Sequence, residues 1–242
     1  MANILTEAWR TYSKNIKIVL LFSIPFIISF LIPILAPMPS YITAGGIFLR
    51  TTGMFINANL VTYAEVVIAD FFSLLFLSFA FVAISLIVKA EKTHNAIPSR
   101  VLRETEAYTG RVFLVMLFYI ALLAVANFAG YFMGFESALT AIVGFFAFMA
   151  IFYAPTGIVM DNKPIARSIK DSTKQVLKQP QYFILWFVLI ALVVSALDAV
   201  LIPLLGLLSA YALLLINALL VVPYFVILQT HAYMRKYSIF RH

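Results

Sequence analysis

The 242-residue chain contains no cysteine, and only 11% of its residues are charged. The first absence excludes disulfides, thiol catalysis and cysteine-ligated metal sites. The second leaves too little polar surface for a water-soluble domain, in which about 25% of residues are charged. The chain also lacks an HExxH or GxSxG motif, a P-loop and the paired aspartates of membrane alcohol phosphotransferases. We therefore expect no enzyme, no cofactor and no metal site.

Hydrophobic residues make up 64% of the chain, and they gather in long uninterrupted runs. A run of 18 or more apolar residues is long enough to cross a hydrocarbon core about 30 Å thick. The sequence therefore predicts an all-α, polytopic membrane protein with a single membrane domain over residues 1–242. The six expected spans are approximately 18–35, 62–88, 112–135, 139–160, 182–202 and 207–229, with one long outer loop at 36–61.

The spans form three hairpin-like units, at about 1–92, 93–160 and 161–242, and a basic amphipathic stretch precedes each unit's first span. The clearest stretch follows Asp161, where Asn162 can cap a helix and Pro164 suits its first turn. Ile165, Ile169, Val176 and Leu177 then recur at helical spacing, and most charged residues take the other side. We expect three interfacial helices that lie flat on one membrane surface.

Every Lys and Arg residue except Arg50 lies on the same side of the six predicted spans as the two termini. Positively charged loops stay in the cytoplasm, so both termini are predicted to be cytoplasmic in a multi-pass protein of the cell membrane. The net charge of +7 sits beside spans, which favours anionic lipid headgroups over nucleic acid as the partner. The candidate lipid contacts are Lys14, Lys17, Arg103, Arg111, Lys170, Lys174 and Lys178.

Asp70 is the ionisable residue that lies inside a predicted span, and such a residue is a functional candidate because its burial is costly. Glu65 and Asp198 are expected near the same outer boundary, with Arg50 as the cation there. These residues predict an acidic vestibule for cations or protons. The competing interpretation is that Asp70 pairs with Arg50 or an asparagine, and that the other carboxylates mark solvated span ends.

Two asparagines inside the spans, Asn127 and Asn217, could line a polar path through the membrane. The commoner use of such residues is as hydrogen-bonding glue between neighbouring helices. Both interpretations remain open from the sequence alone.

The stretch from Tyr153 to Phe187, YAPTGIVMDNKPIARSIKDSTKQVLKQPQYFILWF, resembles a large prokaryotic superfamily of uncharacterised six-span proteins. That superfamily includes the membrane domain found with some glycerophosphodiester phosphodiesterases. The resemblance is carried by Pro155, by the turn at Asp161 and Asn162, by Ser168, and by the basic residues before the next span. It extends to the opening ILTEAWRTYSKNIKIVLLF and the closing AYMRKY. The resemblance implies the six-span architecture and implies no activity.

Two classes of function therefore remain. The first is a membrane-organising, lipid-interacting or partner-binding role without catalysis, in which another copy of the chain or another membrane protein could also be a partner. The alternative is a transporter or channel for a small solute, ion or lipid that uses the acidic vestibule around Asp70. The basic interfacial helices favour the first class, and proline-interrupted spans favour the second.

Overall fold

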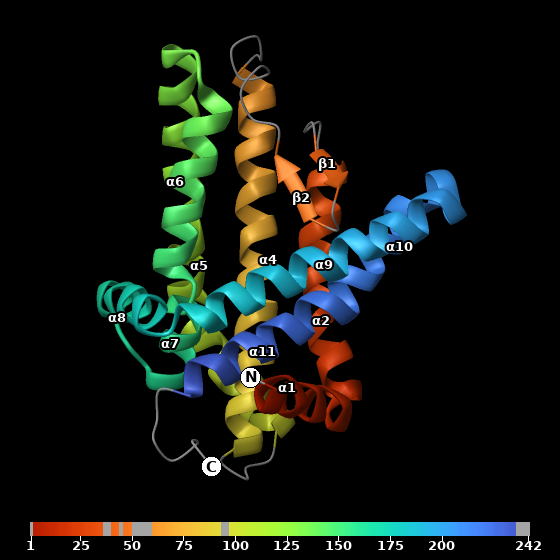
Figure 1. Cartoon of the computed structure of the whole chain (residues 1–242), viewed down its shortest axis with the longest axis vertical. Helices are drawn as coiled ribbons and strands as arrows, with labels where there is room; N and C mark the ends of the chain where they lie inside the picture. The colour runs from red at the N-terminus through yellow and green to blue at the C-terminus, as the bar shows by residue number, and fades with distance from the viewer. Residues whose placement is uncertain (1, 36–39, 44–45, 50–59, 93–96, 236–242) are drawn as a thin grey trace.

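The computed structural model describes residues 2–35, 40–43, 46–49, 60–92 and 97–235 (Figure 1). Its helices confirm the all-α polytopic prediction, because six of the described helical segments are long and apolar enough to cross a membrane. Their bounds are Ile16–Pro33, Ala64–Glu91, Glu104–Met133, Ala138–Asp161, Pro180–Leu205 and Ser209–Met234. A short β-hairpin within the predicted outer loop is the one addition to this helical plan among the described residues.

The first unit consists of α1 (Ala2–Lys14), α2 (Ile16–Leu35), the antiparallel strands β1 (Ser40–Thr43) and β2 (Gly46–Leu49), and α4 (Leu60–Lys92). The second unit consists of α5 (Ile97–Met133), α6 (Glu136–Ile151) and α7 (Ala154–Asp161). The third consists of α8 (Ile165–Lys178), α9 (Pro180–Leu205), the 3₁₀ turn η1 (Gly206–Leu208), α10 (Ser209–Ile216), the π-helical turn η2 (Asn217–Val221) and α11 (Val222–Met234).

The second basic stretch differs from the prediction, because residues 97–111 are the first turns of α5 and not a separate surface helix. Val101, Thr105 and Val112 are fully buried along one side of these turns, so the helix packs on the core from its beginning. Beyond Pro98 no further proline interrupts this stretch, and a helix without a break continues into the span. Within the described segments, two of the three expected surface helices are therefore separate, namely α1 and α8.

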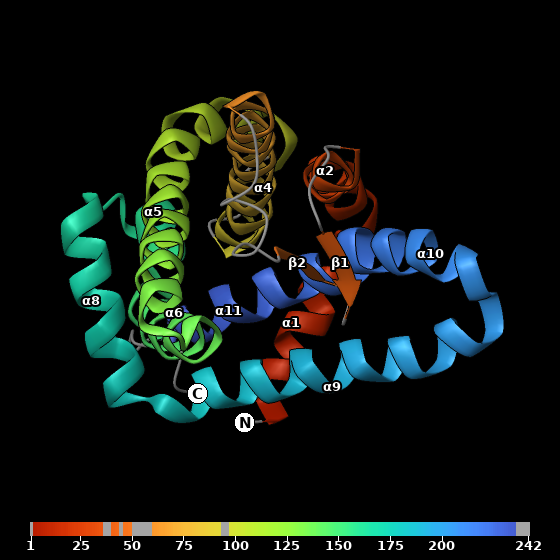
Figure 2. The same ribbon diagram turned by 90° about the horizontal axis from the view of Figure 1, so that it is seen from above.

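Helices α2, α4, α5 and α6 run alongside one another, and α9 and α10 cross them obliquely (Figure 1). Both α1 and α8 lie across the long axis of these four helices, in the lower half of Figure 1 and away from the α5–α6 turn (Figure 2). The first and last described helices pack together, since α1 lies along α11. Arg235 Nη2 lies 3.0 Å from Glu7 Oε1, and Thr11 Oγ1 lies 3.1 Å from His231 Nε2.

The packed core is concentrated at the end of the molecule that holds α1, α7 and α8. The α4 residues from Ala80 to Val88 are all buried there. By contrast, α9 has only Phe183 and Val194 buried along its 26 residues. Apolar side chains exposed on a long helix are expected in a lipid environment, which solvates them as well as a protein core does.

Candidate functional site at the kinked fourth span

The fourth span is kinked where α6 ends at Ile151 and α7 begins at Ala154. Pro155 causes the kink, since it has no N–H to donate to the carbonyl of Ile151 four residues earlier. Phe152 and Tyr153 keep right-handed helical angles, with φ/ψ of −46°/−50° and −93°/−1°. The span is therefore bent and locally open, but it is not unwound.

Side chains from other helices satisfy the backbone groups around this kink. Ser172 Oγ of α8 accepts a hydrogen bond of 2.9 Å from the Tyr153 N–H, and Ser168 Oγ donates one of 2.7 Å to the Ala154 carbonyl. The Gln229 side-chain amide of α11 donates to the Phe152 carbonyl. Because water is absent from a bilayer core, a backbone group freed by a kink needs such a partner. The kink thus depends on α8 and α11.

The buried face of α8 matches the predicted apolar stripe only in part. Ile165, Ile169 and Val176 pack against the protein as predicted, but Leu177 is 65% exposed. The fully buried residues of α8 are Ser168, Ser172, Gln175 and Val176, so polar groups share this face. They are buried there because the backbone groups at the kink need hydrogen bonds as well as apolar contacts. The opposite side carries exposed Arg167, Lys170, Lys174 and Lys178.

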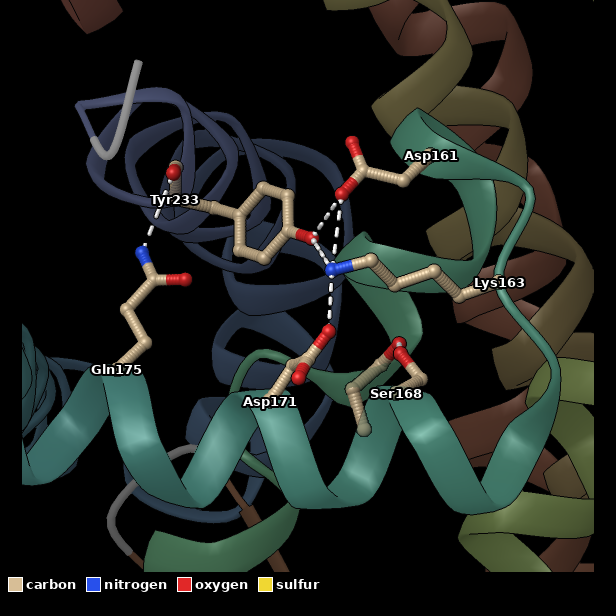
Figure 3. Close-up of polar contacts among 7 residues, drawn as sticks. Asp161, Lys163, Ser168, Asp171, Gln175 and Tyr233 are labelled. Carbon is tan, nitrogen blue, oxygen red and sulfur yellow. Dashed lines mark hydrogen bonds and ion pairs between the residues drawn. The ribbon is translucent and has the colours of Figure 1, made fainter. Parts of the chain in front are cut away.

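An ionic cluster beside the kink joins three elements of the structure (Figure 3). Lys163 Nζ, in the link before α8, lies 2.6 Å from Asp171 Oδ2 and 3.1 Å from Asp161 Oδ2. Tyr233 of α11 donates a hydrogen bond of 2.7 Å to the same oxygen of Asp161. Gln175 of α8 donates one of 3.1 Å to the Tyr233 carbonyl. The contacts connect α7, α8 and α11 into one unit.

The charge on Lys163 is favoured by this cluster. Burial by itself lowers the pKa of a lysine, but the hydrogen bonds to Asp171 and Asp161 and the attraction of both carboxylates outweigh burial and leave the pKa of Lys163 above its ordinary value of 10.5. The lysine is therefore protonated at every physiological pH, and it acts as a fixed bridge between the two carboxylates.

The carboxyl end of α7 is held by residues from α4 and α5. Asn162 ends the helix in the left-handed conformation, with φ of 53°, which is a common role for asparagine. Arg111 donates a hydrogen bond of 2.8 Å to Asn162 Oδ1, and Lys89 donates one of 2.8 Å to the Val159 carbonyl. Asn162 is thus the carboxyl-terminal cap of α7 and not the predicted amino-terminal cap of α8, where Pro164 takes that position.

The residues of the predicted polar path lie on separate elements. Glu65 and Asp70 are on α4, Asn127 on α5, Asp198 on α9 and Asn217 in η2. No hydrogen bond or ion pair joins any two of these five within the described segments. The amide of Asn127 donates to Thr140 Oγ1 at 3.2 Å, and that of Asn217 donates to the Leu213 carbonyl at 2.8 Å. Arg50 lies outside the described residues, and the vestibule stays a prediction.

The predicted lipid contacts also differ in their surroundings. Lys170, Lys174 and Lys178 are exposed on α8, and Lys17 is exposed on α2. The Lys14 side chain is 66% exposed, although its Nζ lies 3.4 Å from Glu91. Arg111 has the structural partners given above, and the side chain of Arg103 lies outside the described part of the chain.

Sequence reasoning missed Ser172, Gln175 and Tyr233 as members of this site. A signal for two of them was present, because Ser168, Ser172 and Gln175 follow one another at spacings of four and three and so share one face of a helix. The third had no local signal, since Tyr233 lies 72 positions from its partner Asp161. Among the residues that the structure describes, no group of three or more histidine and carboxylate side chains could hold a metal ion.

Comparison with family models, curated proteins and solved structures finds no match to this chain. The resemblance of the Tyr153–Phe187 stretch to the six-span superfamily therefore stays an expectation.

Proposed function

We propose that this multi-pass membrane protein has a lipid-interacting, membrane-organising role, in which α8 binds anionic headgroups and no reaction is catalysed. The observation that supports the proposal is the row of basic side chains on α8, formed by Arg167, Lys170, Lys174 and Lys178 and called the basic stripe below. The spacings of three, four and four residues place all four on one side of the helix.

The side chains of the basic stripe have no partner among the residues that the structure describes. All four are exposed and form no hydrogen bond or ion pair with any residue in the described part of the chain. Other cations near the kink are already paired, as Lys163 is with Asp171 and Arg111 is with Asn162. The stripe is therefore available to a partner outside the protein.

The position of α8 favours lipid as that partner. The helix lies across the axis of the long helices, and only Gln179 separates it from the span formed by α9 (Figure 2). A basic stripe at the end of a span faces the headgroup layer. Each basic residue near an anionic surface contributes about 1 kcal/mol. Four of them would contribute roughly 4 kcal/mol, which is enough to enrich anionic lipid around the protein without a tight pocket.

The proposal is tested by replacing Lys170, Lys174 and Lys178 together with glutamine and measuring, by mass spectrometry, the anionic lipid retained by the purified protein. Three lost charges remove about 3 kcal/mol, which corresponds to a loss of enrichment of about 150-fold at low salt. The difference should shrink at high salt, where screening weakens the wild-type interaction. Arginine at the same three positions is the matched control and should retain the lipid. Equal enrichment in wild type and the glutamine variant, with the fold intact, would refute the proposal.

A further inference from the structure

We propose that α8 is a coupling element, through which anionic lipid at the membrane surface stabilises the kink of the fourth span. The inference rests on the proposed lipid interaction and goes beyond it, because it assigns a conformational consequence to lipid binding. Its basis is that the two sides of α8 have different roles. One side carries the basic stripe, and the other supplies the hydrogen-bonding groups of the kink.

The buried side of α8 is fitted closely to the kink. Ser168 and Ser172 bond to the carbonyl of Ala154 and the N–H of Tyr153, as described above. Beside them, a Cβ atom at Gly157 would lie only 2.6 Å from Ser168 Oγ and 3.0 Å from the Tyr233 hydroxyl. The two helices therefore touch without a side chain between them. A displacement of α8 along α7 would break both serine hydrogen bonds.

The ionic cluster makes α7 and α8 move together. Lys163 joins Asp161 at the end of α7 to Asp171 in the middle of α8, and Tyr233 attaches the same cluster to α11 (Figure 3). A displacement of α8 would therefore also pull on the end of α7. Lipid held by the basic stripe would oppose the release of α8 from the protein, and hence the loss of the contacts at the kink.

The sixth span shows a related arrangement. It is interrupted by the π-helical turn η2, and Pro223 follows in α11. Pro223 has no N–H to donate to the carbonyl of Leu219, and the Tyr12 hydroxyl of α1 donates to that carbonyl at 3.4 Å. In contrast, α4 returns to the same end of the molecule without a proline or an interruption over its 33 residues. Each separate surface helix thus covers one proline-interrupted span.

Two conformations of the fourth span follow from these contacts. With α8 docked, the Tyr153 N–H and the Ala154 carbonyl have partners, and the kink is stable. With α8 released, the Tyr153 N–H has no partner in an apolar layer, which is unfavourable, and the Ala154 carbonyl keeps only its hydrogen bond within α7. Phe152 and Tyr153 already have right-handed helical angles, so small rotations there can turn the Tyr153 N–H toward the carbonyl of Met149, while Pro155 still leaves the Ile151 carbonyl without its helical partner. Lipid that binds only the docked form shifts the population toward the kink.

The inference is tested by hydrogen–deuterium exchange of residues 150–160 in nanodiscs, made either of zwitterionic lipid alone or of zwitterionic lipid mixed with anionic lipid. Exchange in the wild type should be about fivefold slower with anionic lipid. This factor corresponds to about 1 kcal/mol, the interaction of one basic residue with the anionic surface, stabilising the docked form. Ser172→Ala keeps the basic stripe but removes the acceptor at the kink. It should retain the lipid enrichment and lose the lipid dependence of exchange.

Ser13→Ala is the matched control, because the Ser13 hydroxyl is exposed and bonds only to the Arg10 carbonyl of its own helix. It should behave as the wild type does. If Ser172→Ala does not fold, Ser168→Ala removes the neighbouring bond to Ala154 and is interpreted in the same way. Lipid enrichment without any change in exchange would overturn the coupling and leave the proposed lipid interaction standing. Absence of lipid enrichment in the wild type would overturn both.

Discussion

Replacement of Gly157 by alanine tests whether the close contact of α7 with α8 is important for stability. In an ordinary helix this change is favourable by about 1 kcal/mol, because alanine has the better helix propensity. Here the new Cβ would lie 2.6 Å from Ser168 Oγ and 3.0 Å from the Tyr233 hydroxyl, so at least one neighbour must move. Overpacking costs roughly 1–3 kcal/mol, and a displaced Ser168 hydroxyl loses its hydrogen bond to the Ala154 carbonyl, which costs about 0.5–1.5 kcal/mol more.

The unfavourable effects together exceed the gain of about 1 kcal/mol in helix propensity, and we expect Gly157→Ala to reduce the free energy of unfolding by about 0.5–3.5 kcal/mol. The assay is thermal or denaturant unfolding of the purified protein in detergent. Gly110→Ala is the matched control, since nothing lies within 4 Å of a Cβ at that position. It should be neutral or stabilising by up to about 1 kcal/mol.

A double variant separates the clash from other effects of the substitution. Ser168→Ala removes the nearest atom, so in the Gly157→Ala background it should cost much less than it does alone. The reasoning would be refuted if Gly157→Ala were as stable as Gly110→Ala, or if the two substitutions at the contact were simply additive.

Two further predictions concern the ionic cluster and the orientation of the chain. The pKa of Lys163 is higher in the folded than in the unfolded protein, so the stabilisation that Lys163 provides should be constant from neutral pH to about pH 10.5 and decline as the pH rises through the folded value. The free energy of unfolding should be measured for the wild type and for Lys163→Gln across this pH range. The difference between the two proteins should become smaller only at high pH. Single cysteines at Ser40 and Ser137 should react with an impermeant reagent from outside the cell, and cysteines at Ser13 and Lys178 should not. The reverse labelling pattern would overturn the cytoplasmic assignment of the termini.

The sequence by itself determined that the chain is a six-span helical membrane protein, because a bilayer requires about 20 apolar residues per span and the composition shows where they lie. It also located α1 and α8, since both are too polar to span and both precede an apolar run. It could not show that residues 97–111 belong to α5. Apolar residues on one side of a helix are expected both at a membrane surface and against a protein core, and only the buried Val101 and Thr105 distinguish the two.

The tertiary structure decided which face of α8 is buried. Periodicity correctly put Ile165, Ile169 and Val176 on the side of α8 that packs against the protein, because burial of apolar surface out of water is favourable. It did not show that Ser168 and Ser172 are buried beside them while Leu177 faces outward, because their burial depends on the hydrogen bonds that the proline kink needs. The partners Asp161 and Tyr233 are brought together across 72 positions by the packing of α7 on α11. No local sequence pattern predicts this contact, because it depends on how two helices that are distant in the sequence pack together.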